Sequence, residues 1–427
     1  MKKPRRTIFG PIKTRFEEFC KSEAVVIMAV RTWIVRFWQG LVMIQKSFVH
    51  YQFPEIREGP GRIRGLGTFF RDKDIDKVLV ITGRSTLEEG TIQPALDSLD
   101  AAGIDYSVEA FYRSAPIGED VENAYQAYMD RSRKAILAIG GRARIDCAKL
   151  VMAKIRKAEL SAPAQKDGEK PKTAGIILVA VPTSAGTGAE ASIDATVSDP
   201  WTKKRKLIHN QAMLPRYVIL DPDLMVKAST EKLALSGMEA ICHVVEGYLN
   251  YLYCTHYERK IAVEAIKRLQ RSLVRAWKDP QNQEAIQDVQ YAGMLGARIA
   301  NRCGHGYTLA MAHAIEQLYD VPHGEAVSII LPAVLSRYKG RGQVRLGDLA
   351  AASGLSTVAG EDGAYYLLRW INYLIVDMRL SGKFGALRAG DFDRIIEMTM
   401  AEVLPGNPIP EIWETETLRG LLRSLQE

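Results

Sequence analysis

Short apolar runs alternate with longer amphipathic stretches in the first half of the chain. The apolar runs cover residues 77–82, 106–111, 135–139 and 175–181. Helical spacing of apolar residues occupies the intervals between them, at residues 87–102, 121–132 and 147–157. Such alternation is typical of a parallel sheet that is buried on both faces by helices. The pattern predicts an α/β domain with a doubly wound parallel sheet, which binds ligands at the carboxyl ends of its strands.

The pattern changes at about residue 229. Long amphipathic stretches follow, at residues 231–249, 256–277, 284–301 and 363–380, and few strand-like runs remain. The 3.6-residue period of their apolar positions indicates helices. The second half therefore predicts an all-α domain, so that the fold class is α/β followed by helical.

Residues 1–50 precede the alternating pattern and form an N-terminal extension. Within it, Ile27, Val30, Ile34, Phe37 and Leu41 fall at helical spacing, which predicts an amphipathic helix. We expect this helix to dock on the body of the protein or on a partner subunit, with peripheral membrane attachment as the alternative. The expected organisation is thus the extension 1–50, a dinucleotide-binding domain 51–228 and a helical metal and substrate domain 229–427.

Composition adds limits to this picture. The chain has 427 residues, of which 47% are hydrophobic and 25% charged, values that are ordinary for a globular protein of two or three domains. Its five cysteines show no CxxC spacing, so neither a disulfide framework nor a cysteine-built zinc site is expected, and a reducing cytoplasm fits best. The net charge of +7 comes partly from runs at residues 2–6 and 203–206, which we interpret as solvated surface and not as a nucleic-acid site. No apolar run reaches the roughly 18 residues that span a bilayer.

Two glycine-containing turns follow predicted strands. Gly140 and Gly141 open a helix, whose first backbone N–H groups and positive dipole end attract phosphate, although such a turn is more often plain chain reversal. The second turn, residues 182–190, combines Thr183, Ser184 and Thr187 with two glycines. Hydroxyls and glycines directly after a buried strand can approach and hydrogen-bond a ligand, so this turn is the stronger candidate.

The helical half carries clustered metal-binding residue types. Glu239 and His243 lie four residues apart, on one face of a predicted helix, which suits either an ion pair or a shared metal ion. His305, His313 and His323 follow within 19 residues, in a chain that has only seven histidines. A metal ion in such a cluster would lower the pKa of a bound hydroxyl, so that the alkoxide could release a hydride to a nicotinamide.

Together these motifs resemble the iron-dependent alcohol dehydrogenases, from about residue 54 onward. Residues 140–149 are similar to the family's GGGSxxDxxK turn, 182–190 to PTTAGTGSE, 220–224 to DPxL and 237–248 to GMDALTHAIEAY. Residues 310–313 and 321–324 resemble its AHxLG and VPHG signatures.

The resemblance implies a set of site residues. Phosphates would lie near Gly140, Gly141, Arg142 and Asp146, and the cofactor would also meet a second group of residues, namely Gly83, Arg84, Ser85, Thr183, Ser184, Thr187 and Lys206. His313 would lie beside the nicotinamide and the substrate, and Glu239, His243 and His323 would hold iron or zinc.

Five positions depart from the family pattern. Arg142 and Ala143 replace a glycine and a serine of the phosphate turn, so Arg142 either pairs with phosphate or weakens the site. Glu239 stands where an aspartate is usual, and Leu309 stands where a ligand histidine is expected, so the metal is bound weakly or lost. Gly83 replaces a frequent aspartate and is followed by Arg84, which favours NADP slightly over NAD.

The sequence therefore predicts an NAD(P)-dependent alcohol dehydrogenase that interconverts a small alcohol and its aldehyde or ketone, expected as a homo-oligomer. Two alternatives remain open. The first is a catalytically weak or inactive homologue that serves as a binding or structural subunit, and the second is a glycerol dehydrogenase-like relative with a three-ligand zinc site.

Overall fold

The computed structural model describes residues 28–47, 53–113, 115–161, 176–202, 205–225, 228–319 and 321–426. The chain divides into two compact units that are discontinuous in sequence. The sheet unit comprises Gln52–Ala240 and Arg268–Arg298, and the helical unit comprises Met1–Tyr51, Ile241–Lys267 and Ile299–Glu427. The predicted fold class, a parallel-sheet half and a helical half, is confirmed.

The sheet unit is built on six parallel strands in the order β1-β8-β5-β4-β2-β3. Their bounds are β1 Glu55–Glu58, β2 Lys77–Gly83, β3 Asp105–Phe111, β4 Ala135–Gly140, β5 Ile177–Pro182 and β8 Tyr217–Leu220. A separate antiparallel ribbon pairs β6 (Asp194–Ser198) with β7 (Arg205–His209). The strand order reverses at β2, because β3 lies on one side of it and β4 on the other.

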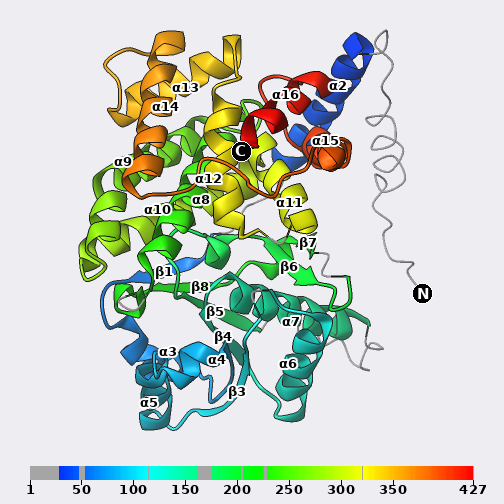
Figure 1. Ribbon diagram of the computed structural model, residues 1–427. Helices are drawn as coiled ribbons and strands as arrows, with labels where there is room; N and C mark the ends of the chain where they lie inside the picture. Colours follow the sequence, from blue (N-terminus) through cyan, green and yellow to red (C-terminus); the bar gives the residue numbers. More distant parts are fainter. Residues whose placement is uncertain are drawn as a thin grey trace. The chain divides into compact units, whose positions relative to one another are not determined.

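Both faces of the sheet are covered, which is why its strands read as continuous apolar runs. Val78 and Val80 of β2 pack with α3 (Leu66–Arg71) and α5 (Gln93–Ala101) on one face. Leu79 and Ile81 pack on the other face with α6 (Gly118–Asp130) and α7 (Arg142–Ser161) (Figure 1). The single helix expected at residues 87–102 is instead two, α4 (Arg84–Glu88) and α5, because Gly90 between them takes a left-handed backbone conformation with φ of 70°.

The helical unit is built from helices, two of which, Met28–Ser47 and Gly360–Asp377, fall on stretches that the amphipathic pattern predicted. Its helices are α2 Met28–Ser47, α11 Tyr307–Tyr319, α12 His323–Leu335, α13 Gly340–Ser353, α14 Gly360–Asp377, α15 Phe392–Gly406 and α16 Thr415–Leu425. Three longer helices have parts in each unit, namely α8 Thr230–Leu249, α9 His256–Lys278 and α10 Gln283–Cys303.

The N-terminal helix α2 docks within the helical unit, but not through the expected face. Phe37 and Leu41 are exposed, whereas Val35 and Gln39 are fully buried. The Gln39 amide donates to the carbonyl oxygens of Leu404 (3.2 Å) and Asn407 (2.8 Å), at the carboxyl end of α15. A polar side chain that satisfies a helix terminus therefore decides the orientation, and the apolar stripe faces outward.

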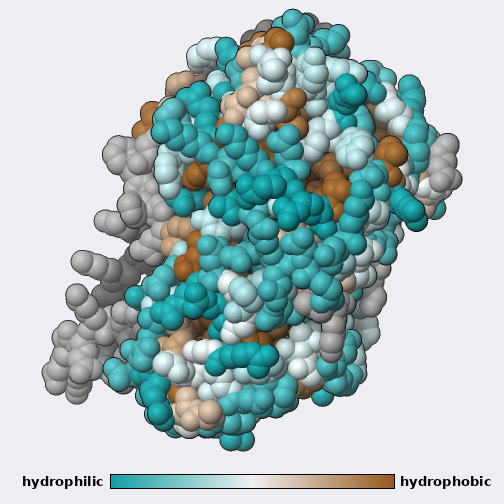
Figure 2. Space-filling view, turned by 90° about the vertical axis from the view of Figure 1, so that its left-hand side faces the viewer, coloured by the Kyte–Doolittle hydropathy of each residue, from teal (hydrophilic) through white to brown (hydrophobic). Residues whose placement is uncertain are grey.

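Most of the described surface visible in Figure 2 is hydrophilic, with smaller hydrophobic areas between. Within the described ranges, no helix combines the length and the hydropathy needed to cross a membrane. The four cysteines in those ranges, Cys147, Cys242, Cys254 and Cys303, are free and buried.

Candidate functional site

The carboxyl ends of β2 and β4 lie side by side at the point where the strand order reverses. Thr82 of β2 pairs with Ile139 of β4, so Gly83 and Gly140, which follow them, end neighbouring strands. In doubly wound sheets the crevice at such a reversal is where ligands bind. Two of the predicted cofactor segments, residues 83–85 and 140–142, thus flank the expected crevice.

Both glycines lie close to one side chain that the sequence did not single out, Arg144. A Cβ on Gly83 would lie 2.9 Å from the Thr86 hydroxyl and 3.1 Å from the Arg144 guanidinium, and a Cβ on Gly140 would lie 2.9 Å from Arg144 Cγ. The guanidinium of Arg144 donates to the carbonyl oxygens of Phe111 (2.8 Å) and Arg113 (2.9 Å), just past β3. A Cβ on Gly141 would meet no atom within 4 Å outside its own stretch of backbone, so the space beside this residue is open.

In the turn after β5, the glycines allow close packing against neighbouring helices, and the residues that carry hydroxyl groups are partly accessible. A Cβ on Gly186, where φ is 109°, would lie 2.4 Å from the Ser236 carbonyl oxygen, and one on Gly188 would lie 2.6 Å from that of Gly293. These glycines therefore allow close packing against helices α8 and α10. Thr183, Ser184 and Thr187 are half-buried and partly accessible, and the Ser184 and Thr187 hydroxyls lie 3.4 Å apart.

The other predicted cofactor residues differ in accessibility. Arg84 and Ser85 are exposed at the start of α4, and Lys206 is exposed on β7. Asp146 is buried and accepts a hydrogen bond from the Thr196 backbone N–H (3.0 Å), so it fixes strand β6 to α7. Burial raises the pKa of Asp146, against the opposing charges of Lys149 and Arg142. Its contact with a cofactor stays a prediction, as do the contacts of the exposed residues.

Arg142, the first residue of α7, forms an ion pair with Glu239 of α8 within the sheet unit. The Glu239 side chain is 4% exposed and that of Arg142 is 33% exposed. Arg142 also acts on buried Glu190, whose pKa burial raises to about 7 while Lys149 and Arg142 oppose the rise. Arg142, which stands where the family's phosphate turn has a glycine, therefore points toward buried carboxylates.

In the helical unit, one carboxylate joins two of the clustered histidines. Glu402 Oε1 of α15 lies 2.7 Å from His305 Nε2 and 2.7 Å from His313 Nδ1. Burial opposes ionisation of Glu402, but the charges and hydrogen bonds of His313 and His305 hold its pKa well below its usual range. An ionised carboxylate only accepts, so both ring nitrogens that face Glu402 carry hydrogens.

His323 lies beside this group and has its own carboxylate. Its Nδ1 is 3.0 Å from Glu316 Oε1, and its ring stacks on that of His313 with centroids 5.2 Å apart. A buried residue of α8, Glu246, accepts from the backbone N–H groups of Gly306 (2.8 Å) and Thr308 (2.6 Å) and so caps the start of α11. Sequence reasoning missed both residues: Glu402 lies 89 and 97 positions from the two histidines it contacts, and Glu246 lies within the matched segment 237–248 but was not singled out.

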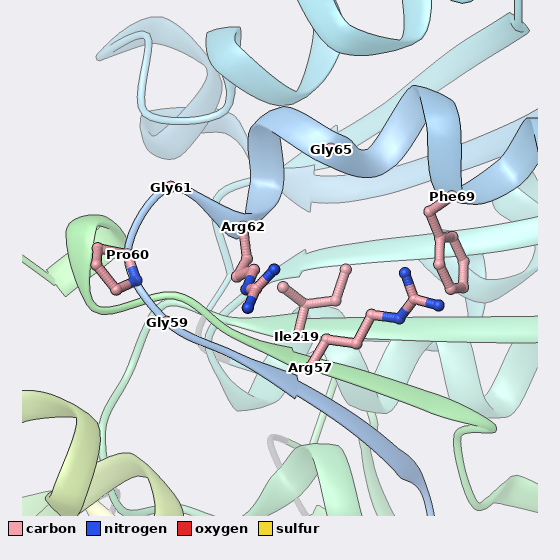
Figure 3. Close-up of a pocket in the computed structure, with 8 residues that line it drawn as sticks. All are labelled: Arg57, Gly59, Pro60, Gly61, Arg62, Gly65, Phe69 and Ile219. Carbon is pink, nitrogen blue, oxygen red and sulfur yellow. The ribbon is translucent and has the colours of Figure 1, made fainter.

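A pocket of about 290 Å³ lies elsewhere in the sheet unit, between β1, β8 and the turn η2 (Arg62–Gly65). Figure 3 shows Arg57 and Arg62 reaching into it. Arg62 donates to the Glu58 carbonyl oxygen (2.8 Å), and the Arg57 guanidinium lies 4.7 Å from the Phe69 ring centroid. None of the predicted site residues lines this pocket.

Comparison with protein-family models identifies the family of this chain. Residues 54–222 match the family model described as iron-containing alcohol dehydrogenase, and residues 233–422 match the C-terminal model of the Fe-containing alcohol dehydrogenase family. The chain belongs to the iron-containing alcohol dehydrogenase family. The resemblance read from the motifs is thereby confirmed, and the chain is an alcohol oxidoreductase by family.

The relatives of this chain are similar to it at low identity. The 1,3-propanediol dehydrogenase of Citrobacter freundii is 27% identical over 358 residues, which are 81% of this chain and 90% of the relative. The NAD-dependent methanol dehydrogenase of Bacillus methanolicus is 25% identical, over 74% of this chain and 83% of the relative. A crystal structure of 1,3-propanediol oxidoreductase superposes with a TM-score of 0.78 at 25% identity, over 88% of this chain and 99% of the other.

The family description implies iron, so the donor set of this chain can be tested for fit. Across the described residues, no group of three or more His, Cys, Asp or Glu side chains is arranged to hold a metal ion. Of the expected ligands, the Glu239 carboxylate pairs with Arg142 and His323 pairs with Glu316. Leu309, at the position of the further ligand, is a buried hydrocarbon. The residues present therefore do not fit the family's metal ion.

Proposed function

We propose that this chain is an NAD(P)-dependent oxidoreductase that interconverts a small alcohol and its aldehyde or ketone by hydride transfer. The main support is the reversal of strand order at β2, because Gly141 and the segment 83–85 follow the ends of the neighbouring strands β4 and β2. The accessible hydroxyls of Thr183, Ser184 and Thr187 follow the next strand, β5. A dinucleotide needs a crevice for its phosphates and polar groups for its nicotinamide end.

Oxidation of an alcohol also releases a proton, and His313 is the proposed acceptor. A bound nicotinamide would accept the hydride from the carbinol carbon, and His313 Nε2 would accept the hydroxyl proton, which leaves a carbonyl. Glu402 supports this assignment, because its bond to the Nδ1–H of His313 makes Nε2 the basic atom of the neutral ring. The same bond stabilises the imidazolium that forms.

We further propose that NADP(H) is accepted alongside NAD(H), with a slight preference for the phosphorylated form. Arg84 supports this proposal, since it is exposed directly after β2, where an acidic residue would repel a 2′-phosphate. The printed name of the methanol dehydrogenase relative, by contrast, specifies NAD. We also expect a homo-oligomer in a reducing cytoplasm; the free, buried cysteines suit that compartment.

A second function is favoured by one observation, the Arg142–Glu239 ion pair. A catalytically weak or inactive homologue, acting as a binding or structural subunit, would retain the crevice but not the metal chemistry of the family. Both candidates are expected to bind the cofactor, but only the first is expected to turn over a substrate.

The test is cofactor titration followed by a substrate panel. Purified protein is titrated with NADH and NADPH, and binding is followed by nicotinamide fluorescence. Short-chain alcohols, diols and their aldehydes are then assayed with both cofactors. Binding together with turnover supports the oxidoreductase, and binding without turnover on any substrate supports the second candidate. Failure to bind either dinucleotide contradicts the proposal.

A further inference from the structure

Arg142 provides the positive charge beside the Glu239 carboxylate that a metal ion would provide in a metal site. A carboxylate that is 4% exposed is costly to bury without a counter-charge. In a metal site that charge is the cation itself, whereas here it is the guanidinium of Arg142. Arginine stays protonated at all physiological pH values and presents a planar fork of donors that matches a carboxylate.

The local backbone explains how the arginine reaches this position. Arg142 is the first residue of α7 and follows directly on Gly140 and Gly141, which end β4. A glycine at position 142 would leave the space beside Glu239 without a side chain from this turn. The charge of Arg142 also opposes the raised pKa values of Asp146 and Glu190. Its guanidinium therefore serves a group of buried acids and is not a solvated surface cation.

We propose that Arg142 is a built-in cation that takes the place of the divalent metal at Glu239, so that this chain is metal-independent. A divalent ion that approached Glu239 would meet a fixed positive charge at the same carboxylate and would have to displace it. Leu309 fits this arrangement, since a site that is balanced by one guanidinium needs no further metal ligand. The inference concerns metal binding and holds whether or not the chain turns over alcohols.

The experiment compares the wild type with Leu309→His, Arg142→Gly and the double variant, after incubation with zinc or anaerobic ferrous iron and extensive dialysis. Metal content is measured by mass spectrometry and zinc binding by calorimetry. Wild type and Leu309→His should each retain less than about a tenth of a metal ion per chain, and the double variant should retain about one. Arg142→Lys, which keeps the charge, should remain metal-free. Lys154→Ala, which removes an exposed cation from the same helix, is the matched control and should equal the wild type.

Thermal unfolding shows whether a variant has folded. The double variant should unfold at a lower temperature than the wild type without metal, and zinc should raise that temperature, because an ion that binds only the folded state stabilises it. Retention of about one metal ion per chain by the wild type would overturn the proposal. So would zinc uptake by Leu309→His with Arg142 in place, or a folded double variant that still takes up no metal. Cofactor binding, measured in parallel, reports on the proposed function separately.

Discussion

Glu402 offers the sharpest test of the histidine arrangement. Replacing it by alanine leaves the N–H groups of His305 and His313 without their shared acceptor, at side chains that are 23% and 28% exposed. Hydrogen bonds to a charged group contribute about 1.5–3 kcal/mol each, and water that reaches the freed groups recovers part of this, so we expect a loss of roughly 2–3 kcal/mol. Glutamine keeps an acceptor oxygen and loses only the charge, so Glu402→Gln should cost roughly 1 kcal/mol.

Thermal unfolding at neutral pH measures these losses. For a unit of about 200 residues each kcal/mol shifts the midpoint by roughly 2–4 °C, which predicts a fall of about 4–12 °C for Glu402→Ala and a smaller one for Glu402→Gln. Arg394→Gln, an exposed change on the same helix, is the control and should leave the midpoint nearly unchanged.

The pH dependence of that difference follows from the pKa of Glu402. Because the folded pKa is lowered, the carboxylate contributes stability at pH values above its unfolded pKa of about 4.3 and loses that contribution as the pH falls toward the folded value. The gap between wild type and Glu402→Gln should therefore be full at neutral pH and shrink below about pH 4. A gap that matches the effect of the Arg394→Gln control, or one that stays constant into acid, would refute the assigned role of Glu402.

Three further predictions concern other parts of the chain. Arg84→Asp should lower kcat/KM with NADPH by about tenfold or more and leave NADH little changed, and an equal effect on both cofactors would argue against contact with the 2′-phosphate. Gly186→Ala should destabilise the sheet unit by roughly 2 kcal/mol or more, through the clash with Ser236 and the left-handed backbone, whereas Gly141→Ala should leave the unfolding midpoint alone and weaken dinucleotide binding. Gln39→Ala should cost about 1–3 kcal/mol in thermal unfolding by leaving two carbonyl groups unsatisfied, and a truncation of residues 1–48 should still bind cofactor.

The sheet could be predicted from the sequence because its strands are buried on both faces. Residues 78–81 are apolar without interruption and contribute alternately to the two cores, so the apolar run marks the strand directly. The break at Gly90 was missed, because apolar spacing continues across it while the backbone conformation does not. Helix α2 shows the same limit, since its apolar stripe predicts a helix but not which face docks. That choice depends on Gln39 and on carbonyl groups some 365 residues away along the chain.

The candidate site was predictable where it depends on local chemistry. Gly83 and Gly140 end their strands as expected, because a glycine after an apolar run marks a turn whatever surrounds it. The partners of the charged residues were not predictable in this way. Glu402 reaches His305 across 97 positions and Arg142 reaches Glu239 across a similar distance, and no periodic pattern links such pairs. A long side chain in a turn shows only that a charge is present, and the fold decides which carboxylate it meets.

The departures from the family pattern gain meaning when they are taken together. Arg142 alone suggests a damaged phosphate turn, Leu309 alone a lost ligand and Glu239 alone a longer carboxylate. The ion pair joins two of them, because the longer Glu239 and the added Arg142 meet each other. The third change removes a ligand that a guanidinium does not need. In a chain that had merely lost its metal, the buried Glu239 carboxylate would carry a desolvation cost with no counter-charge to offset it. Here the charge is balanced within the sheet unit. By the resemblance, each of the three changes weakens a metal site, and within the sheet unit the Arg142–Glu239 pair balances the buried carboxylate without a metal.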